Sequence, residues 1–273
     1  MKRRVAITGA TGFVGRQVVR RLLEQGCEVV TLVRSGAAVD MLPNDVVTIC
    51  CGDLFGADVD ALEEALLGSN ILVHCAWYSE PGQYISSPKN YDCLHGSINL
   101  FRAAVNAGVE KIVGLGTCLE YDLRSGYVAA DSPLKPETLY AFAKAACYVG
   151  LQRLVATNTT EALWCRVFYL FGEGEDERRL VPYVRKCLAK GQTVDLTDGS
   201  QIRDYLDVAN AGNMIADYAL GDQTGAANIC SGIPISIRDF VTQIASEQGR
   251  EHLLNFGARP FNEADPPIVV GIP

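Results

Sequence analysis

Short apolar runs alternate with amphipathic stretches through the first two-thirds of the chain. The apolar runs lie at residues 5–8, 28–33, 46–51, 71–76, 111–117 and 162–169, and stretches with helical spacing lie at 16–25, 58–67, 90–107 and 138–155. Continuous apolar strands separated by helices are typical of a parallel sheet that is covered on both faces. The pattern therefore predicts an α/β fold with a doubly wound parallel sheet.

The rhythm changes near residue 170. Helical spacing continues at 180–190, 208–220 and 237–247, but the apolar runs at 193–196 and 202–206 are short. We expect a first domain over residues 1–170 and a smaller α/β lobe over 171–273, interleaved as one structural unit. Ligands of open α/β sheets bind at the carboxyl ends of the strands, so this lobe is expected to bind the substrate.

Composition narrows the classes of partner. The 273-residue chain has a net charge of −8, which argues against a nucleic-acid binder, and it has no run near the ~20 apolar residues of a membrane span. Its ten cysteines include no Cys-x-x-Cys pair, and there are only three histidines, so no metal site is expected. Cysteines inside apolar runs indicate reduced core thiols, as in a cytoplasmic protein.

A glycine-spaced turn follows the first apolar run directly. Gly9, Gly12 and Gly15 stand between the strand at 5–8 and the helix expected from Arg16. This order places free N–H groups and the positive end of a helix where a pyrophosphate can bind. Gly9 would permit the tight turn, Gly12 the close approach of the ligand, and Gly15 the packing of helix on strand. The turn predicts a Rossmann-type dinucleotide site.

The end of the second strand bears on which dinucleotide binds. A site specific for NAD usually has an acidic residue there for the ribose hydroxyls, but this strand ends in Arg34 and Ser35. These side chains suit a 2′-phosphate and favour NADP over NAD. A solvated Arg34 with Asp40 turned toward the ribose is the alternative.

A second constellation combines Thr117, at the end of the fifth strand, with Tyr140 and Lys144 on one face of a long helix. A tyrosine hydroxyl is a poor base at neutral pH, and a neighbouring ammonium group would lower its pKa. Tyr140 could then exchange a proton with a substrate oxygen that Thr117 also holds. Each residue alone is commonplace; their order after the glycine turn indicates a catalytic group.

With these motifs the sequence resembles the extended short-chain dehydrogenase/reductase family, in its nucleotide-sugar epimerase/dehydratase group. The resemblance covers nearly the whole chain and rests on segments 8–15, 52–54, 73–76, 116–121, 140–144, 166–172 and 201–208. It implies Thr117, Tyr140 and Lys144 as catalytic residues. It implies cofactor contacts from Gly9, Thr11, Gly12, Phe13, Val14, Arg34, Ser35, Asp53, Leu54, Cys75, Ala76, Tyr140 and Lys144. On the substrate side it points to Cys118, Tyr169 and Arg203, with Arg203 gripping the nucleotide diphosphate. Trp77, after the fourth strand, could stack on or line the pocket of a sugar, or simply pack in the core.

Departures from the family pattern narrow the reaction. The 4,6-dehydratases have Asp and Glu after the catalytic Thr, whereas Cys118 and Leu119 follow Thr117 here. A dehydratase is therefore not expected. A C4 epimerase and a nucleotide-sugar 4-keto reductase, or the reverse dehydrogenase, remain, and the preference for NADP favours reduction of a 4-keto-6-deoxy sugar at C4. An epimerase would instead retain NAD, and a non-catalytic nucleotide-sensing protein is a remote alternative.

The resemblance also implies a homodimer formed through the helices at 90–107 and 138–155.

Overall fold

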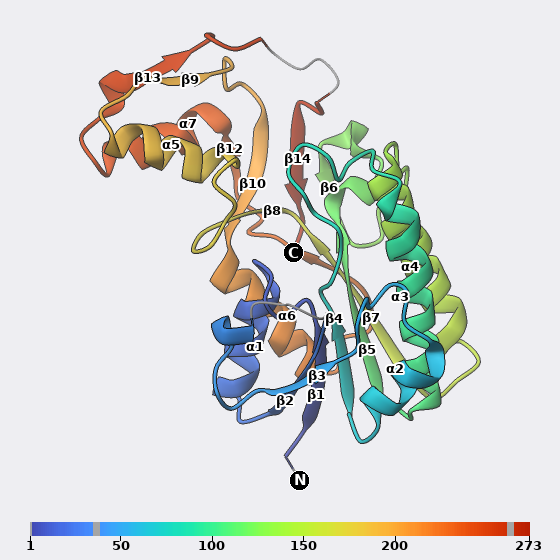
Figure 1. Cartoon of the computed structure of the whole chain (residues 1–273). Coiled ribbons are helices and arrows are strands. Elements are labelled where there is room, and N and C mark those ends of the chain that lie inside the picture. The colour runs from blue at the N-terminus through green and yellow to red at the C-terminus, as the bar shows by residue number, and fades with distance from the viewer. Residues whose placement is uncertain (1, 35–38, 261–264) are drawn as a thin grey trace.

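Figure 1 shows the computed structural model, which describes residues 2–34, 39–260 and 265–273. A large parallel sheet lies between two layers of helices, and a smaller lobe stands beyond the carboxyl ends of its strands. This arrangement confirms the predicted Rossmann-type α/β fold.

The main sheet has seven parallel strands in the order β11-β7-β5-β4-β1-β2-β3. In chain order they are β1 (Arg4–Thr8), β2 (Glu28–Val33), β3 (Val47–Cys50), β4 (Ile71–His74), β5 (Lys111–Thr117), β7 (Glu161–Val167) and β11 (Gly225–Ile229). The apolar runs predict six of these strands. They do not predict β11, because its sequence Gly-Ala-Ala-Asn-Ile has few large apolar side chains to mark a strand.

Helices cover both faces of the sheet. One face packs against α1 (Gly15–Glu24) and α6 (Val208–Leu220), and the other against α2 (Val59–Leu66), α3 (Lys89–Asn106) and α4 (Leu139–Val155). Along β1 the alternation of side chains follows directly: Val5 and Ile7 belong to the first core, and Ala6 belongs to the second. Two buried faces explain why the strands are apolar throughout.

The lobe is built on a second sheet in the order β12-β10-β14-β6, with β8 paired to β10. Its strands are β6 (Tyr127–Val128), β8 (Tyr169–Phe171), β10 (Ile202–Asp207), β12 (Pro234–Ser236) and β14 (Ile268–Gly271). Beyond it lie α5 (Leu180–Ala189), α7 (Ile237–Ser246), β9 (Val194–Leu196) and β13 (Leu254–Phe256) (Figure 1). Single 3-10 turns lie at Val39–Met41, Cys118–Glu120, Leu123–Ser125 and Glu251–Leu253.

The two parts of the chain interleave. Although β11 and α6 follow residue 170, they pack in the main sheet and its helical layer, and β6 from the first part joins the lobe sheet. The buried Asp204 carboxylate ties the junction together by accepting bonds from the N–H groups of Ser231, Gly232 and Gly271. The assignment of residues 1–170 to cofactor binding and 171–273 to substrate binding stays a prediction. In the described ranges no helix is long and apolar enough to cross a membrane.

Candidate functional site

A cleft of about 1650 Å³ opens between the carboxyl ends of the main strands and the lobe. It is larger than the ~300–1,000 Å³ of an ordinary small-molecule pocket. Ser35 lies outside the described residues. Every other residue that the sequence singles out as a site residue lines this cleft, namely Gly9, Thr11, Gly12, Phe13, Val14, Arg34, Asp53, Leu54, Cys75, Ala76, Trp77, Thr117, Cys118, Tyr140, Lys144, Tyr169 and Arg203. The fold thus brings together segments that are far apart in the chain.

The glycine turn has the shape of a dinucleotide cradle. Gly9 adopts a φ of 69°, and a Cβ atom there would lie 2.7 Å from the backbone nitrogen of Ala76. A Cβ atom on Gly15 would lie 2.1 Å from the carbonyl oxygen of Gly9, so both positions require glycine. Helix α1 starts with no side-chain cap and no acid in its first turn. The N–H groups of Phe13 and Val14 take no partner from the described part of the chain, so they fit an incoming phosphate.

Arg34 is exposed at the end of β2 and lines the same cleft. It makes no hydrogen bond or ion pair within the described ranges, so its guanidinium is available to an anion. The alternative residue, Asp40, is exposed in the 3-10 turn Val39–Met41 and does not line the cleft. Asp53 and Leu54 line the neighbouring wall after β3, and the Asp53 carboxylate accepts the N–H of Phe55.

The end of β4 is held by His74. Its Nδ1 lies 2.7 Å from the Thr8 hydroxyl and its Nε2 lies 2.8 Å from the Ser97 hydroxyl. Burial lowers the pKa of His74 to about 3, so the ring is neutral and cannot act as a base near neutral pH. The Thr8 hydroxyl also accepts the N–H of Ala76. These bonds fix the backbone at Cys75 and Ala76, which passes beside the glycine turn.

Thr117 ends β5 and is held from behind by a buried carboxylate. Its N–H donates to Oε1 of Glu120 at 2.8 Å, and Glu120 also pairs with Nε of Arg166 at 2.8 Å. Both charged side chains are almost fully buried, and the indole N–H of Trp164 donates to the same carboxylate. The Glu120 carboxylate thus accepts from Thr117, Arg166 and Trp164. No pattern in the sequence marks Glu120, because a single Glu beside an apolar run gives no indication that it is buried.

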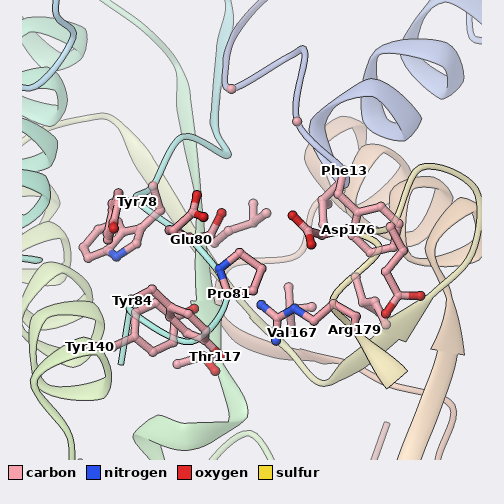
Figure 2. Close-up of a pocket in the computed structure, with 18 of the residues that line it drawn as sticks. Phe13, Tyr78, Glu80, Pro81, Tyr84, Thr117, Tyr140, Val167, Asp176 and Arg179 are labelled. Carbon is pink, nitrogen blue, oxygen red and sulfur yellow. The ribbon is translucent and has the colours of Figure 1, made fainter. Parts of the chain in front are cut away.

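Tyr140 lies in the first turn of α4, the helix that carries the proposed catalytic pair, and is beside Thr117 (Figure 2). Burial raises the pKa of its phenol above the usual range, Tyr84 raises it further, and hydrogen bonding with the Thr117 side chain lowers it. We expected Lys144 to lower this pKa. Instead, the Lys144 ammonium donates to the carbonyl of Leu115 at 2.6 Å and lies 3.9 Å from the centre of the Trp77 ring. The net shift of the Tyr140 pKa is therefore upward, opposite to the direction that the sequence predicts, because burial is its largest cause.

The loop at 78–88 contributes residues that the sequence did not indicate. The ring of Tyr84 packs edge-on against Tyr140 with 4.9 Å between centroids, and Tyr140 N–H donates to the carbonyl of Ile85. Glu80 pairs with Arg178 of the lobe at 2.5 Å, and the Arg179 guanidinium lies over the Tyr84 ring. Figure 2 shows Glu80, Pro81 and Tyr84 between the two walls of the cleft. Loops like this one have no hydrophobic periodicity that could predict their position.

The far end of the cleft combines a buried cation with aromatic rings. Arg203 is 3% exposed and its guanidinium lies 5.3 Å from the centre of the Tyr169 ring. It pairs with Asp265 at 4.0 Å, and the Asp265 side chain is half exposed, so this ion pair is loose. Cys118 is buried close by, and burial raises the pKa of its thiol to about 12. Arg203 is thus a buried cation with spare N–H donors, which suits the binding of an anionic ligand. No cluster of His, Cys, Asp or Glu in the described ranges could hold a metal ion.

Comparisons with known proteins agree with this geometry. The model of the family described as "NAD dependent epimerase/dehydratase family" matches residues 5–229. The chain is 24% identical to dTDP-6-deoxy-L-talose 4-dehydrogenase (NAD(+)) of Aggregatibacter actinomycetemcomitans, over 98% of each chain. It is 28% identical to UDP-glucose 4-epimerase of Mycolicibacterium smegmatis, over 90% of this chain and 83% of that protein.

Among solved structures, the chain is similar to UDP-N-acetylglucosamine 4-epimerase from Methanobrevibacter ruminantium, solved in complex with UDP-N-acetylmuramic acid. The TM-score is 0.88 at 22% identity, covering 100% of this chain and 90% of that one. This likeness supports the fold. Because the family model matches most of the chain, the resemblance found in the sequence is confirmed, as is the expectation of an enzyme. The protein belongs to the NAD dependent epimerase/dehydratase family.

Proposed function

We propose that this enzyme reduces a nucleotide-linked 4-keto-6-deoxy sugar at C4, with a nicotinamide dinucleotide as hydride donor. The observation that best supports this reaction is the pairing of the Tyr140 hydroxyl, on α4, with the Thr117 hydroxyl at the end of β5, where the adjoining Glu120 carboxylate is buried in its pair with Arg166. The relative that matches this chain end to end is named as a 4-dehydrogenase of a 6-deoxy sugar, and that reaction is the reverse of the proposed one.

The chemistry that a bound reduced nicotinamide supplies is transfer of a hydride to the carbonyl carbon. Tyr140 then donates its phenolic proton to the C4 oxygen, and the Thr117 hydroxyl orients that oxygen. With that hydride and this proton the ketone would become an alcohol, and the Tyr140 phenolate would regain a proton from solvent. The raised pKa keeps the Tyr140 phenol protonated throughout the neutral range, so its proton is present when the hydride arrives, although a phenol with so high a pKa is a weaker acid than one with a pKa near the working pH.

We propose that the dinucleotide lies along the glycine turn, with its pyrophosphate at the uncapped start of α1 and its adenosine end near Asp53 and Leu54. The unpaired Arg34 supports recognition of a 2′-phosphate, and hence NADP. The relative's name specifies NAD(+), which supports the other choice. The ratio of kcat/KM for NADPH and NADH decides between them.

We propose that the substrate's diphosphate binds Arg203 and that its sugar lies toward Tyr140, between Cys118 and Tyr169. This placement assigns cofactor binding mainly to residues 1–170 and substrate binding to the lobe. A volume of about 1650 Å³ has room for both ligands at once.

A dehydratase is disfavoured by the residues after Thr117. Cys118 is a buried neutral thiol and Leu119 is apolar, so neither can serve as an acid or base. Glu120 is the nearest carboxylate in sequence, but it is committed to Arg166, Trp164 and the backbone of Thr117. A C4 epimerase is the second candidate, supported by the 28% identity to a UDP-glucose 4-epimerase.

The two candidates differ in net cofactor use. The purified protein is incubated with NADPH or NADH and with 4-keto-6-deoxy hexoses linked to dTDP, UDP or CDP, while absorbance of the reduced nicotinamide is followed. A reductase consumes one equivalent per sugar reduced. Interconversion of C4 epimers without net consumption, with NAD released only on denaturation, would establish the epimerase instead.

We also propose that the enzyme is a homodimer through α3 and α4. The outer faces of these helices expose Tyr91 (56%), Phe142 (48%) and Val149 (50%), which leaves an apolar surface on adjacent helices. Light scattering is expected to give twice the chain mass, and the double variant Phe142→Asp with Val149→Asp is expected to be monomeric. A monomeric unmodified protein would overturn this proposal.

A further inference from the structure

Lys144 is a buried cation without a carboxylate partner. Its side chain is only 4% exposed, and it makes no ion pair within the described ranges. Its ammonium has two compensating neighbours, the Leu115 carbonyl at 2.6 Å and the face of the Trp77 indole, whose centre is 3.9 Å away. Buried charges normally require a partner, and here the aromatic face takes the place of an acid.

The Trp77 indole is itself held in place. Its Nε1 donates to Oδ1 of Asn90 at 2.9 Å. Asn90 is fully buried, and its Nδ2 donates to the carbonyls of Tyr84 and Ser87. The ring also meets Tyr140 edge-on, at 6.3 Å between centroids and 76° between planes. Trp77 thus contacts both Tyr140 and Lys144 and cannot rotate without breaking its partly buried hydrogen bond to Asn90.

We propose that Trp77 is a positioning residue of the Tyr140–Lys144 pair, which holds the Lys144 ammonium charged and in place through its indole face. This proposal rests on the proposed function, because that function makes Tyr140 the proton donor; the catalytic role of Lys144 is the one that the family resemblance implies. The Lys144 ammonium lies against one face of the indole, which leaves only the opposite face for stacking on a sugar. Trp gives the strongest cation–π contact of the aromatic residues. Replacing Trp77 by Phe should therefore weaken the contact with Lys144, and replacing it by Leu should remove it.

The proton affinity of Lys144 reports on this contact. Burial lowers the pKa of Lys144 to about 8, within reach of a titration. The other titratable groups that act on it are Cys75, Cys93, Glu120 and Cys147, and Lys144 in turn acts on His74. None of these groups is removed when Trp77 is replaced. Loss of the indole face would destabilise the ammonium and lower its pKa further.

The experiment is a pH titration of the full-length protein carrying 13C-labelled lysine, followed by NMR at the Lys144 Cε signal, which Lys144→Arg identifies. We expect the titration midpoint to fall by about one pH unit in Trp77→Leu, with Trp77→Phe in between. Tyr84→Leu is the matched control. It removes a ring that contacts Tyr140 and makes no cation–π contact with Lys144, so the Lys144 midpoint should not move. An unchanged or raised midpoint in Trp77→Leu overturns the proposal, and Trp77→Phe decides if the Leu variant does not fold.

A second readout separates this inference from the proposed function. In the reductase assay, the alkaline limb of kcat/KM is expected to move to lower pH in Trp77→Leu and to be partly restored in Trp77→Phe. If the unmodified protein reduces no 4-keto sugar, the proposed function fails, but the NMR midpoints still test the contact. If it reduces the sugar and the limb does not move, the positioning role fails alone.

Discussion

The Nδ1 atom of His74 lies 2.7 Å from the hydroxyl of Thr8 in the neighbouring strand. The Ser97 hydroxyl donates to the carbonyl of Cys93, so it must accept from Nε2 of His74. The proton of the neutral ring is therefore on Nε2, and the Thr8 hydroxyl donates to Nδ1. These hydrogen bonds join β1, β4 and α3 beside the glycine turn. Their directions require His74 to be uncharged, so the geometry of this part of the site depends on a neutral histidine.

Stability is expected to fall at acidic pH because of His74. Its pKa lies near 3 in the fold and at ~6.5 in the unfolded chain, so between these values only the unfolded chain binds the proton. The contribution is fully present above pH ~6.5 and is lost at about 1.4 kcal/mol per pH unit as the pH falls toward 3. Urea unfolding at pH 7, 6 and 5 measures it.

His74→Gln is the control for that slope. The amide keeps one donor for Ser97 and one acceptor for Thr8 but does not titrate. The variant should lose the histidine's share of the pH dependence. If the free energy of unfolding changes with pH equally in the variant and the unmodified protein, groups other than His74 cause that change.

Removing one member of the Glu120–Arg166 pair is expected to destabilise the fold strongly. Glu120→Gln leaves the 1% exposed Arg166 guanidinium without its counter-charge, a change that typically costs about 3–5 kcal/mol. The double variant Glu120→Gln with Arg166→Met should recover part of this loss. Urea unfolding of the unmodified protein, Glu120→Gln, Arg166→Met and the double variant gives the coupling free energy between the two side chains. Additive losses would show that the two side chains do not stabilise each other.

Tyr140→Phe is expected to lower kcat about 10²–10⁴-fold, because the proton donor is lost while the ring that packs on Tyr84 is kept. Binding of the dinucleotide, measured by fluorescence, should stay within a few-fold of the unmodified protein. Tyr78→Phe removes a phenol that lines the same cleft and lies outside the proposed catalytic group, which makes it a matched control. An unchanged kcat in Tyr140→Phe would show that Tyr140 is not the proton donor.

Arg34→Ala is expected to lower kcat/KM for NADPH by about 10-fold or more, since a charge-assisted contact to phosphate contributes about 1.5–3 kcal/mol. The value for NADH should change little, because that cofactor lacks the 2′-phosphate. Kinetics with both cofactors measure the ratio. Equal losses for the two would assign Arg34 to a feature they share and would remove the basis for proposing NADP.

Much of the fold could be predicted from local pattern. The apolar runs gave six strands and the helical spacing gave the helices that cover them, with ends displaced by one or two residues; for example, α4 spans Leu139–Val155 where 138–155 was expected. In the main sheet the exception is β11, and in the lobe the short strands β6, β8, β12, β13 and β14 were not predicted. The small residues of β11 are compatible with a turn or a strand, and pairing with β7 decides in favour of the strand.

The candidate site divides in the same way. The glycine turn, Thr117 and the Tyr140–Lys144 spacing are local features, so the sequence alone identified them and the family they indicate. Tyr84, Asn90 and Glu120 act through contacts with residues far along the chain, and no local pattern marks them. The partners of Lys144 are the clearest case. Spacing on one helix indicated a tyrosine partner, but the buried ammonium took the nearest carbonyl and aromatic face, because a desolvated charge is positioned by everything that surrounds it.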